Sequence, residues 1–182
     1  MLNLYLIECT IKGYDHISDL LLAKYWVITS CKYDGCKNLN NIVIPDSVTE
    51  IGSSAFYGCE NLTNIVIPDS ITTIGERVFE GCENLTSIVI GNSVTTIGEL
   101  AFSDCENLTS IVIPYSVTTI GDYAFSDCLN LKNIVIPDSV TTIGSEAFYG
   151  CMALEKICVS KGKVDYFKKL LPMELYYKIV EK

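Results

Sequence analysis

A segment of 23 residues recurs five times along this chain of 182 residues. The copies span residues 39–61, 62–84, 85–107, 108–130 and 131–153, and each follows the pattern LxxIVIxxS[VI]TxIGxx[AV]FxxCx[NA]. A fixed apolar pattern of this length indicates a solenoid in which each copy forms one coil and contacts its neighbours. The sequence therefore predicts stacked parallel β-strands joined by short turns and helical segments, with a cap at each end.

The second copy illustrates the elements expected within one coil. Residues 62–67 are rich in β-branched side chains and predict a strand whose alternate residues point inward, with Val66 pointing outward. Pro68 ends this strand, because proline has no N–H to continue a ladder. A second extended run over residues 71–74 closes on Gly75, which indicates either a positive φ or a close backbone approach.

A short helical segment is expected next in each coil, around Ala55 and Phe56 in the first copy. Its end is marked by a column that holds only glycine or aspartate, the residue types that favour a left-handed conformation. This column consists of Gly58, Gly81, Asp104, Asp127 and Gly150.

The chain is predicted to divide into three parts of a single structural domain. Residues 1–38 form an N-terminal cap with a strand over 2–11, a helix from Asp15 and a degenerate half-copy. Residues 39–153 form the five copies, and residues 154–182 form a final strand and a C-terminal helical cap. The half-copy is carried by Tyr25, Ile28, Tyr33 and Cys36, at the positions of Val48, Ile51, Phe56 and Cys59. The apolar face of the C-terminal helix consists of Val164, Phe167, Leu170 and Leu171, followed by Pro172 and an apolar stretch over 175–180.

Charge disfavours several classes of partner. The formal net charge is −9, and residues 39–153 carry fourteen acidic against two basic side chains. Such a surface repels phosphate backbones, so nucleic-acid binding is not expected. No apolar run is long enough to cross a bilayer, and residues 1–11 lack the basic start of a signal peptide, so the cytoplasm is the default compartment. The acidic side chains of the copies either serve solubility or form a rim that would attract a basic partner, and they include Asp46, Glu60, Asp69, Glu83, Glu106 and Asp138.

Nine cysteines are the most conspicuous candidates for chemistry. Stacking brings neighbouring members of the repeated column about 5 Å apart, but in-register side chains point the same way, the wrong geometry for a disulfide. We expect buried thiols that act as small hydrophobes and donate weakly to turn carbonyls, as suits a reducing compartment. The column consists of Cys36, Cys59, Cys82, Cys105, Cys128 and Cys151.

No catalytic, cofactor-binding or metal-binding residue is predicted. Cys31 and Cys36 lack a second pair of cysteine or histidine ligands for zinc. His16 is the only histidine, and it lies on the expected N-terminal helix, away from the repeated cysteine column. The glycines recur singly, and so they form no phosphate-binding loop. The sequence therefore predicts a protein that is not an enzyme.

A binding surface is expected on the outward side of the first strand. Five stacked valines form an apolar strip, the valine stripe, consisting of Val43, Val66, Val89, Val112 and Val135. The candidate partner-binding residues are Asn64, Val66, Ser87, Val89, Ser110, Val112, Asn133 and Val135. One interpretation is sheet propensity and cross-strand packing, and the other is a shallow strip on which a protein partner lies. On the second strand, Thr49, Thr72, Thr95, Thr118 and Thr141 predict a solvated threonine column.

Segments such as 108–114, with Val117 to Gly121 and Ala124 to Cys128, resemble the BspA-like leucine-rich repeat family. The resemblance covers roughly residues 25–159, and the sequence from Val159 to Tyr166 is similar to the end-piece common in that family. It implies a curved leucine-rich-repeat solenoid, often a bacterial surface protein that binds host or matrix proteins. The resemblance implies no catalytic residue. It also implies the cell surface or secretion as the alternative to the cytoplasm.

The function expected from these observations is a non-catalytic protein–protein interaction scaffold that binds an unidentified protein partner on its sheet face, without cofactors. The chain is expected to be a monomer rather than an oligomer and not to insert into a membrane. The alternative is a structural or self-assembly module without a dedicated ligand. A thiol-based redox protein is the third hypothesis, and it depends on the reactivity of the native thiols.

Overall fold

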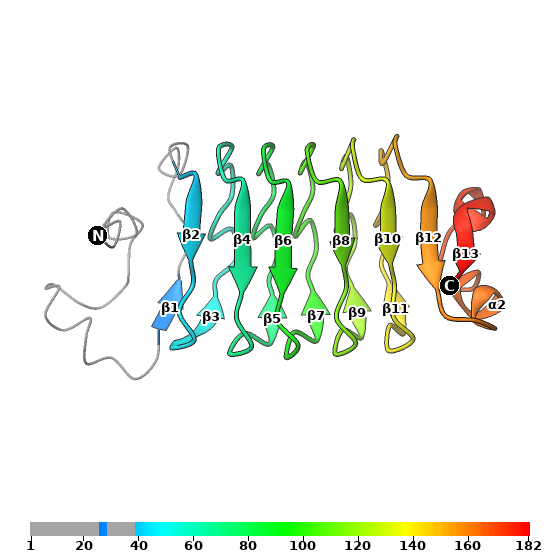
Figure 1. The fold of residues 1–182 in the computed structure, drawn as a ribbon, viewed down its shortest axis with the longest axis horizontal. Coiled ribbons are helices and arrows are strands. Elements are labelled where there is room, and N and C mark those ends of the chain that lie inside the picture. The colour runs from blue at the N-terminus through cyan, green and yellow to red at the C-terminus, as the bar shows by residue number, and fades with distance from the viewer. Residues whose placement is uncertain (1–25, 29–38) are drawn as a thin grey trace, which may run out of the picture.

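The computed structural model describes residues 26–28 and 39–182, which form a solenoid of parallel strands (Figure 1). The predicted leucine-rich-repeat solenoid is thus confirmed. The predicted N-terminal strand and helix, together with Tyr25, Tyr33 and Cys36, lie outside the described residues. Of the half-copy, β1 (Trp26–Ile28) is described, and it pairs in parallel with β3 (Val48–Ile51), with Ile28 opposite Ile51 as the sequence alignment predicts.

One strand from each coil contributes to the sheet face, the side of the solenoid turned toward the viewer in Figure 1. These strands are β2 (Asn41–Val43), β4 (Asn64–Ile67), β6 (Ser87–Ile90), β8 (Ser110–Val112), β10 (Asn133–Val135) and β12 (Lys156–Val159). Successive strands are shifted by the repeat length, so that Ile65 pairs with Ile88 and Ile111 with Ile134. The hydrogen-bonded ladder runs from β2 to β6 and again from β8 onward.

Shorter strands form a second ladder behind the first. After β3, they are β5 (Thr73–Ile74), β7 (Thr96–Ile97), β9 (Thr119–Ile120) and β11 (Thr142–Ile143). Each contributes one outward threonine and one inward isoleucine, with Ile74 opposite Ile97. Three of these glycines, Gly98, Gly121 and Gly144, need a close backbone approach: a Cβ on Gly121 would lie 2.6 Å from Gly98 C. A Cβ on Gly75 would meet nothing nearer than 3.7 Å, so close approach, not a positive φ, is the reason for glycine at the three later positions only.

The third side of each coil is the turn column, residues 52–59 and their equivalents 75–82, 98–105, 121–128 and 144–151. The short helix predicted around Ala55 and Phe56 is wrong, because the structure has only turns there. Ser54 and Gly58 have positive φ values of 59° and 64°, which interrupt a right-handed helix on both sides of the pair. The predicted left-handed glycine or aspartate column is confirmed by φ values of 55–72°.

The core is a stack of identical layers. Phenylalanine rings of successive turn columns stack with centroids 5.3–5.6 Å apart and interplanar angles of 2–11°, from Phe56 to Phe148. Inward isoleucines and leucines from the two ladders pack around them and are buried. Because each ring contacts its equivalents in the next coils, the repeated apolar positions are buried by stacking rather than within one copy.

The C-terminal segment ends the stack. It contains α2 (Val164–Phe167), the 3₁₀ helix η2 (Met173–Lys178) and β13 (Ile179–Glu181), which pairs in parallel with β12. The predicted apolar helix face is only partly buried, with Phe167 and Leu171 in the core. The strand β13 was not expected from the sequence, and it extends the sheet face by one strand.

Candidate protein-binding surface

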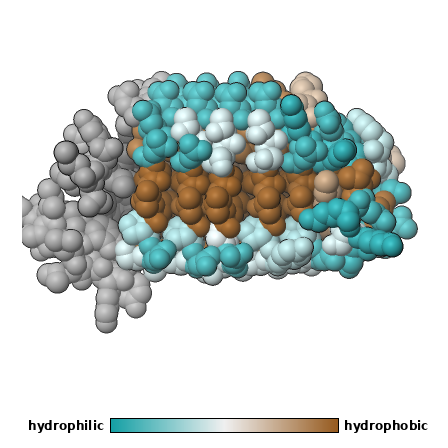
Figure 2. Space-filling view, viewed as in Figure 1, coloured by the Kyte–Doolittle hydropathy of each residue, from teal (hydrophilic) through white to brown (hydrophobic). Residues whose placement is uncertain are grey.

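The valine stripe lies on the sheet face, between buried isoleucines. The exposed fractions of Val43, Val66, Val89 and Val112 are 81%, 54%, 56% and 69%, while Val135 is half-buried. Backbone pairing sets Val43 opposite Val66 and Val66 opposite Val89. Figure 2 shows a continuous hydrophobic band along this side of the solenoid, with hydrophilic residues on both flanks. The alternation predicted for these strands thus produces an uninterrupted apolar surface.

The structure extends the valine stripe beyond the five predicted residues. Cys158 of β12 lies opposite Val135, and Val180 of β13 lies opposite Cys158. Both side chains are partly exposed. Cys158 could have been found by adding 23 to Val135, whereas no sequence signal places Val180, because β13 does not belong to the repeat.

Small polar residues border the stripe at the start of each strand. Asn64, Ser87, Ser110 and Asn133 are exposed and stand in register beside one another. Asn64 Nδ2 donates to Thr63 Oγ1 at 3.0 Å, so part of this flank is already hydrogen-bonded. The candidate residues named from the sequence therefore lie together on one surface, an apolar stripe with a polar flank.

The threonine column on the second ladder is a different kind of surface. Its members are exposed, but hydroxyls of the column bond to the coil before them. Thr95 Oγ1 donates to Thr72 O at 3.1 Å, and Thr118 Oγ1 donates to Thr95 O at 3.3 Å. These bonds lie within the solenoid, so hydroxyls of this exposed surface already have partners.

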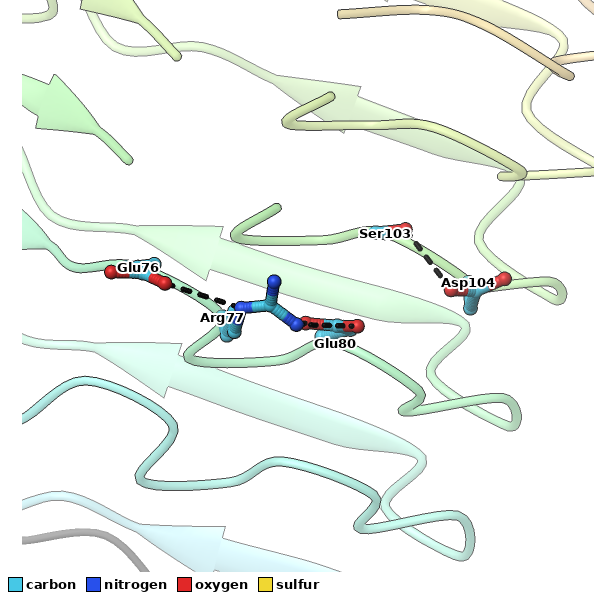
Figure 3. Close-up of polar contacts among 5 residues, drawn as sticks. All are labelled: Glu76, Arg77, Glu80, Ser103 and Asp104. Atoms are coloured by element: carbon cyan, nitrogen blue, oxygen red, sulfur yellow. Dashed lines mark hydrogen bonds and ion pairs between the residues drawn. The ribbon is translucent and has the colours of Figure 1, made fainter. Parts of the chain in front are cut away.

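An ion-pair cluster lies on the turn column, whereas Asp46, Glu60, Asp69, Glu83, Glu106 and Asp138 lie outside it. Arg77 lies between Glu76 and Glu80, with N–O distances of 3.2 and 3.1 Å (Figure 3). Burial raises the pKa of Glu80, with Asp104 acting in the same direction, while Arg77 opposes the shift. The same ion pair with Glu80 raises the pKa of Arg77. This cluster joins neighbouring acidic residues through one cation and leaves the turn column predominantly acidic.

The repeated thiols are buried structural groups, as predicted. Cys82 Sγ donates to Phe56 O at 3.2 Å, and the same contact recurs from Cys105, Cys128 and Cys151 at 3.0–3.3 Å. Burial raises the pKa of the Cys105 thiol well above its usual range. The raised pKa disfavours the thiolate of Cys105, which is the nucleophilic form, whereas the hydrogen bond with Cys128 lowers the pKa of Cys151.

Two further observations concern the residues that the structure describes. Across 26–28 and 39–182, no cluster of three or more histidine, cysteine or acidic side chains is arranged to hold a metal ion. Within the same ranges, no helix combines the length and apolar character that a membrane span needs.

These features define a class of protein: a repeat solenoid with a row of exposed apolar side chains on its sheet face. A family model described as the BspA type leucine-rich repeat region, with six copies, matches residues 26–169. The chain therefore belongs to the BspA-type leucine-rich repeat family. A search of curated proteins finds no match.

Solved structures of bacterial leucine-rich repeat proteins are similar to this chain. A leucine-rich repeat protein from Bacteroides ovatus is 32% identical with a TM-score of 0.69, over 88% of this chain and 42% of its own. The T. pallidum leucine-rich repeat protein is 34% identical with a TM-score of 0.68, over 74% of this chain and 64% of its own. A leucine-rich cell surface protein from Faecalibacterium prausnitzii is 37% identical with a TM-score of 0.67, over 69% of this chain and 33% of its own. This chain thus spans less than two thirds of the length of each.

Proposed function

We propose that this chain is a non-catalytic scaffold that binds a protein partner on the valine stripe. The observation that carries the proposal is the row of exposed valines, four of them more than half exposed, on one uninterrupted side of the solenoid. A contiguous exposed apolar surface bordered by polar residues is typical of protein interaction sites. Because the strands are held by the stacked core, little conformational entropy is lost when the surface binds.

The negative charge of the repeats suggests that the partner carries basic residues around its apolar contact surface. Residues 39–153 carry fourteen acidic and two basic side chains, so the apolar stripe stands in a negative field. A partner with an apolar centre and basic flanks would be steered to this face, and its association rate would fall with added salt. The proposed partner is therefore a protein with a shallow apolar surface rimmed by lysine or arginine.

The test uses a charged triple variant of the stripe, Val66→Lys, Val89→Glu and Val112→Lys. Alternating signs avoid like charges on neighbouring strands, which would destabilise the sheet. The matched control carries the same charges in the same coils on the opposite ladder: Thr72→Lys, Thr95→Glu and Thr118→Lys. Chemical crosslinking and affinity capture from the native source, with circular dichroism on each variant, should show partner loss for the valine variant alone.

Two outcomes would refute the proposal. One is equal capture by the valine variant and the wild type. The other is a molecular mass by light scattering that rises with protein concentration and falls in the valine variant. The second outcome would favour the self-assembly alternative, in which another copy covers the stripe.

The setting of this interaction belongs to the same proposal. The Faecalibacterium protein is named a leucine-rich cell surface protein, which supports extracellular display over the cytoplasmic default. Digestion of intact cells with an added protease, followed by immunodetection of the chain, tests the placement. Loss of the chain from intact cells supports display, and full protection until lysis contradicts it.

A further inference from the structure

The last copy of the turn column has three backbone donors without partners among the described residues. At every boundary between described coils, three alternate N–H groups donate to carbonyls of the following coil. At the first boundary, Ser54, Phe56 and Gly58 donate in this way, and at the next three the equivalent N–O distances are 2.8–3.0 Å. The equivalent groups of the last copy, Glu146, Phe148 and Gly150, donate to no residue within 26–28 or 39–182.

The apolar stack ends at the same place. The ring of Phe125 has a neighbour on each side, whereas the ring of Phe148 stacks only on Phe125 among the described aromatic residues. The carbonyl of Phe125 accepts the thiol of Cys151, but no described thiol donates to the carbonyl of Phe148. The edge therefore lacks the backbone acceptors and the aromatic stacking partner that a further coil would supply, although Phe148 is buried, with an exposed fraction of 5%.

A cavity lies against this edge. Its volume is about 900 Å³, and it lies between residues 143–152 of the last copy and residues 169–178 of the C-terminal segment. The walls include Phe148 and Met152 on one side and Leu170, Leu175 and Tyr177 on the other. A volume of this size suits a small ligand or a short peptide segment. The C-terminal segment closes the far side, so the end of a second solenoid does not fit.

We propose that this cavity binds an extended peptide segment by main-chain addition to the open edge of the turn column. The inner coils indicate what the bound segment looks like, because at each of the four inner boundaries the following coil covers the equivalent edge. There the covering backbone offers three alternate carbonyls, together with an alanine or valine followed by phenylalanine. The bound segment accepts hydrogen bonds from Glu146, Phe148 and Gly150. Since Phe148 itself is only 5% exposed, the aromatic ring of the segment contacts Met152 and Tyr177, the exposed side chains of the cavity wall.

The chemistry of the edge agrees with a peptide. Its three donors need carbonyl acceptors at the spacing of alternate residues, which an extended backbone provides. An uncovered row of such groups is a known template for strand addition. An isolated peptide must be ordered on binding, and we expect a Kd on the order of 0.1 mM. This site is separate from the valine stripe, and neither proposal depends on the other.

The probe is a synthetic peptide with the sequence of residues 121–128 carrying Cys128→Ser, capped at both ends. Added to the full chain labelled with ¹⁵N, it should shift the amide signals of Glu146, Phe148 and Gly150 and slow their hydrogen exchange about tenfold. The control peptide carries Phe125→Asp in addition and should bind at least about tenfold more weakly, because it loses the ring that contacts Met152 and Tyr177.

Two protein variants separate the site from general surface effects. Tyr177 lines the cavity and Tyr115 does not, and both are exposed, at 79% and 73%. Tyr177→Glu should weaken peptide binding about three- to tenfold, and Tyr115→Glu should leave it unchanged. No shift of the three amides at about 1 mM peptide would overturn the proposal, as would shifts confined to the valine stripe. Exchange protection of these amides that rises with protein concentration in the absence of peptide would assign the edge to a second copy instead.

Discussion

The sheet face and the turn column are built by the same 23-residue repeat, yet they present opposite surfaces. On the sheet face the backbone is paired within the ladders, and a row of valine side chains remains exposed. On the turn column the side chains of alanine, phenylalanine and cysteine are buried, and alternate backbone N–H groups hold the next coil. Within one repeat, the turn column thus holds the coils together, and the sheet face exposes side chains to a partner. Substitutions in the turn column should change folding, and substitutions on the sheet face should change binding.

The largest expected effect is in the phenylalanine stack. Phe102 is fully buried, with its ring centroid 5.3 Å from that of Phe79 and 5.4 Å from that of Phe125. Phe102→Ala should lower the free energy of unfolding by about 3–5 kcal/mol, since it removes packing from two coils. Val89→Ala, on the sheet face of the same coil, should cost less than about 0.5 kcal/mol. Urea unfolding followed by circular dichroism measures both, and equal losses would contradict the separation of roles.

The glycine column offers a comparison within itself. A Cβ on Gly121 would lie 2.6 Å from Glu99 N, whereas on Gly75 its nearest neighbour would be 3.7 Å away. Gly121→Ala should therefore destabilise the fold by about 1–3 kcal/mol. Gly75→Ala should be neutral or stabilise it by up to about 1 kcal/mol, because alanine restricts the unfolded chain. Thermal unfolding of the two variants should give midpoint shifts of different size, and similar shifts would disprove the close approach.

The sheet face and the turn column should also differ in the rate at which their cysteines react with a thiol reagent. Cys158 lies on the sheet face and is partly exposed, while Cys105 is buried in the turn column, where burial raises its pKa. A maleimide at neutral pH should label Cys158 at least about a hundredfold faster than Cys105. Mass spectrometry of proteolytic peptides assigns each label to its cysteine. Rapid labelling of Cys105 in the folded chain would revive the hypothesis of a thiol-based redox protein.

The smallest effect should come from Glu80 on the turn column. Burial raises its pKa above the ordinary 4.5, although Arg77 opposes the shift. A raised carboxyl pKa adds stability below pH 4.5 that is lost as pH rises through the folded-state pKa. In the wild type the melting temperature should therefore decrease slightly as pH rises through the pKa of Glu80. In Glu80→Gln this decrease should be absent. Glu83→Gln, at an exposed glutamate of the same coil, controls for the loss of a surface carboxylate. If the melting temperature of Glu80→Gln fell more steeply with rising pH than that of the wild type, the direction assigned to the pKa shift of Glu80 would be wrong.

Repetition explains how much of the architecture was predictable. Five aligned copies predict the stacked strands, the inward isoleucines, the exposed valines and the buried thiols, because a periodic constraint appears five times in one chain. The turns around Ala55 were missed, because the left-handed residue before each of these apolar pairs has no residue type in common. That position is occupied by Ser54, Arg77, Leu100, Tyr123 and Glu146. Stacking, not local preference, sets its conformation.

The non-repeating parts were less predictable for the same reason. β13 pairs with β12 although nothing in its sequence repeats an earlier strand, so the continuation of the stripe to Val180 could not be foreseen. The open donors of Glu146, Phe148 and Gly150 depend on how the C-terminal segment packs beyond the last copy. Only the folded chain shows that this segment leaves a cavity there.

The most direct test of the central claim is a triple substitution that keeps the shape of the stripe and removes its apolar character: Val66→Thr, Val89→Thr and Val112→Thr. Threonine is β-branched and suits a strand, so sheet propensity is retained. Stability by urea unfolding and capture of the crosslinked partner are measured on the same preparation. The account predicts that the free energy of unfolding changes by less than about 1 kcal/mol while partner capture is lost. A stability loss of several kcal/mol with capture intact would show that the valines serve packing alone.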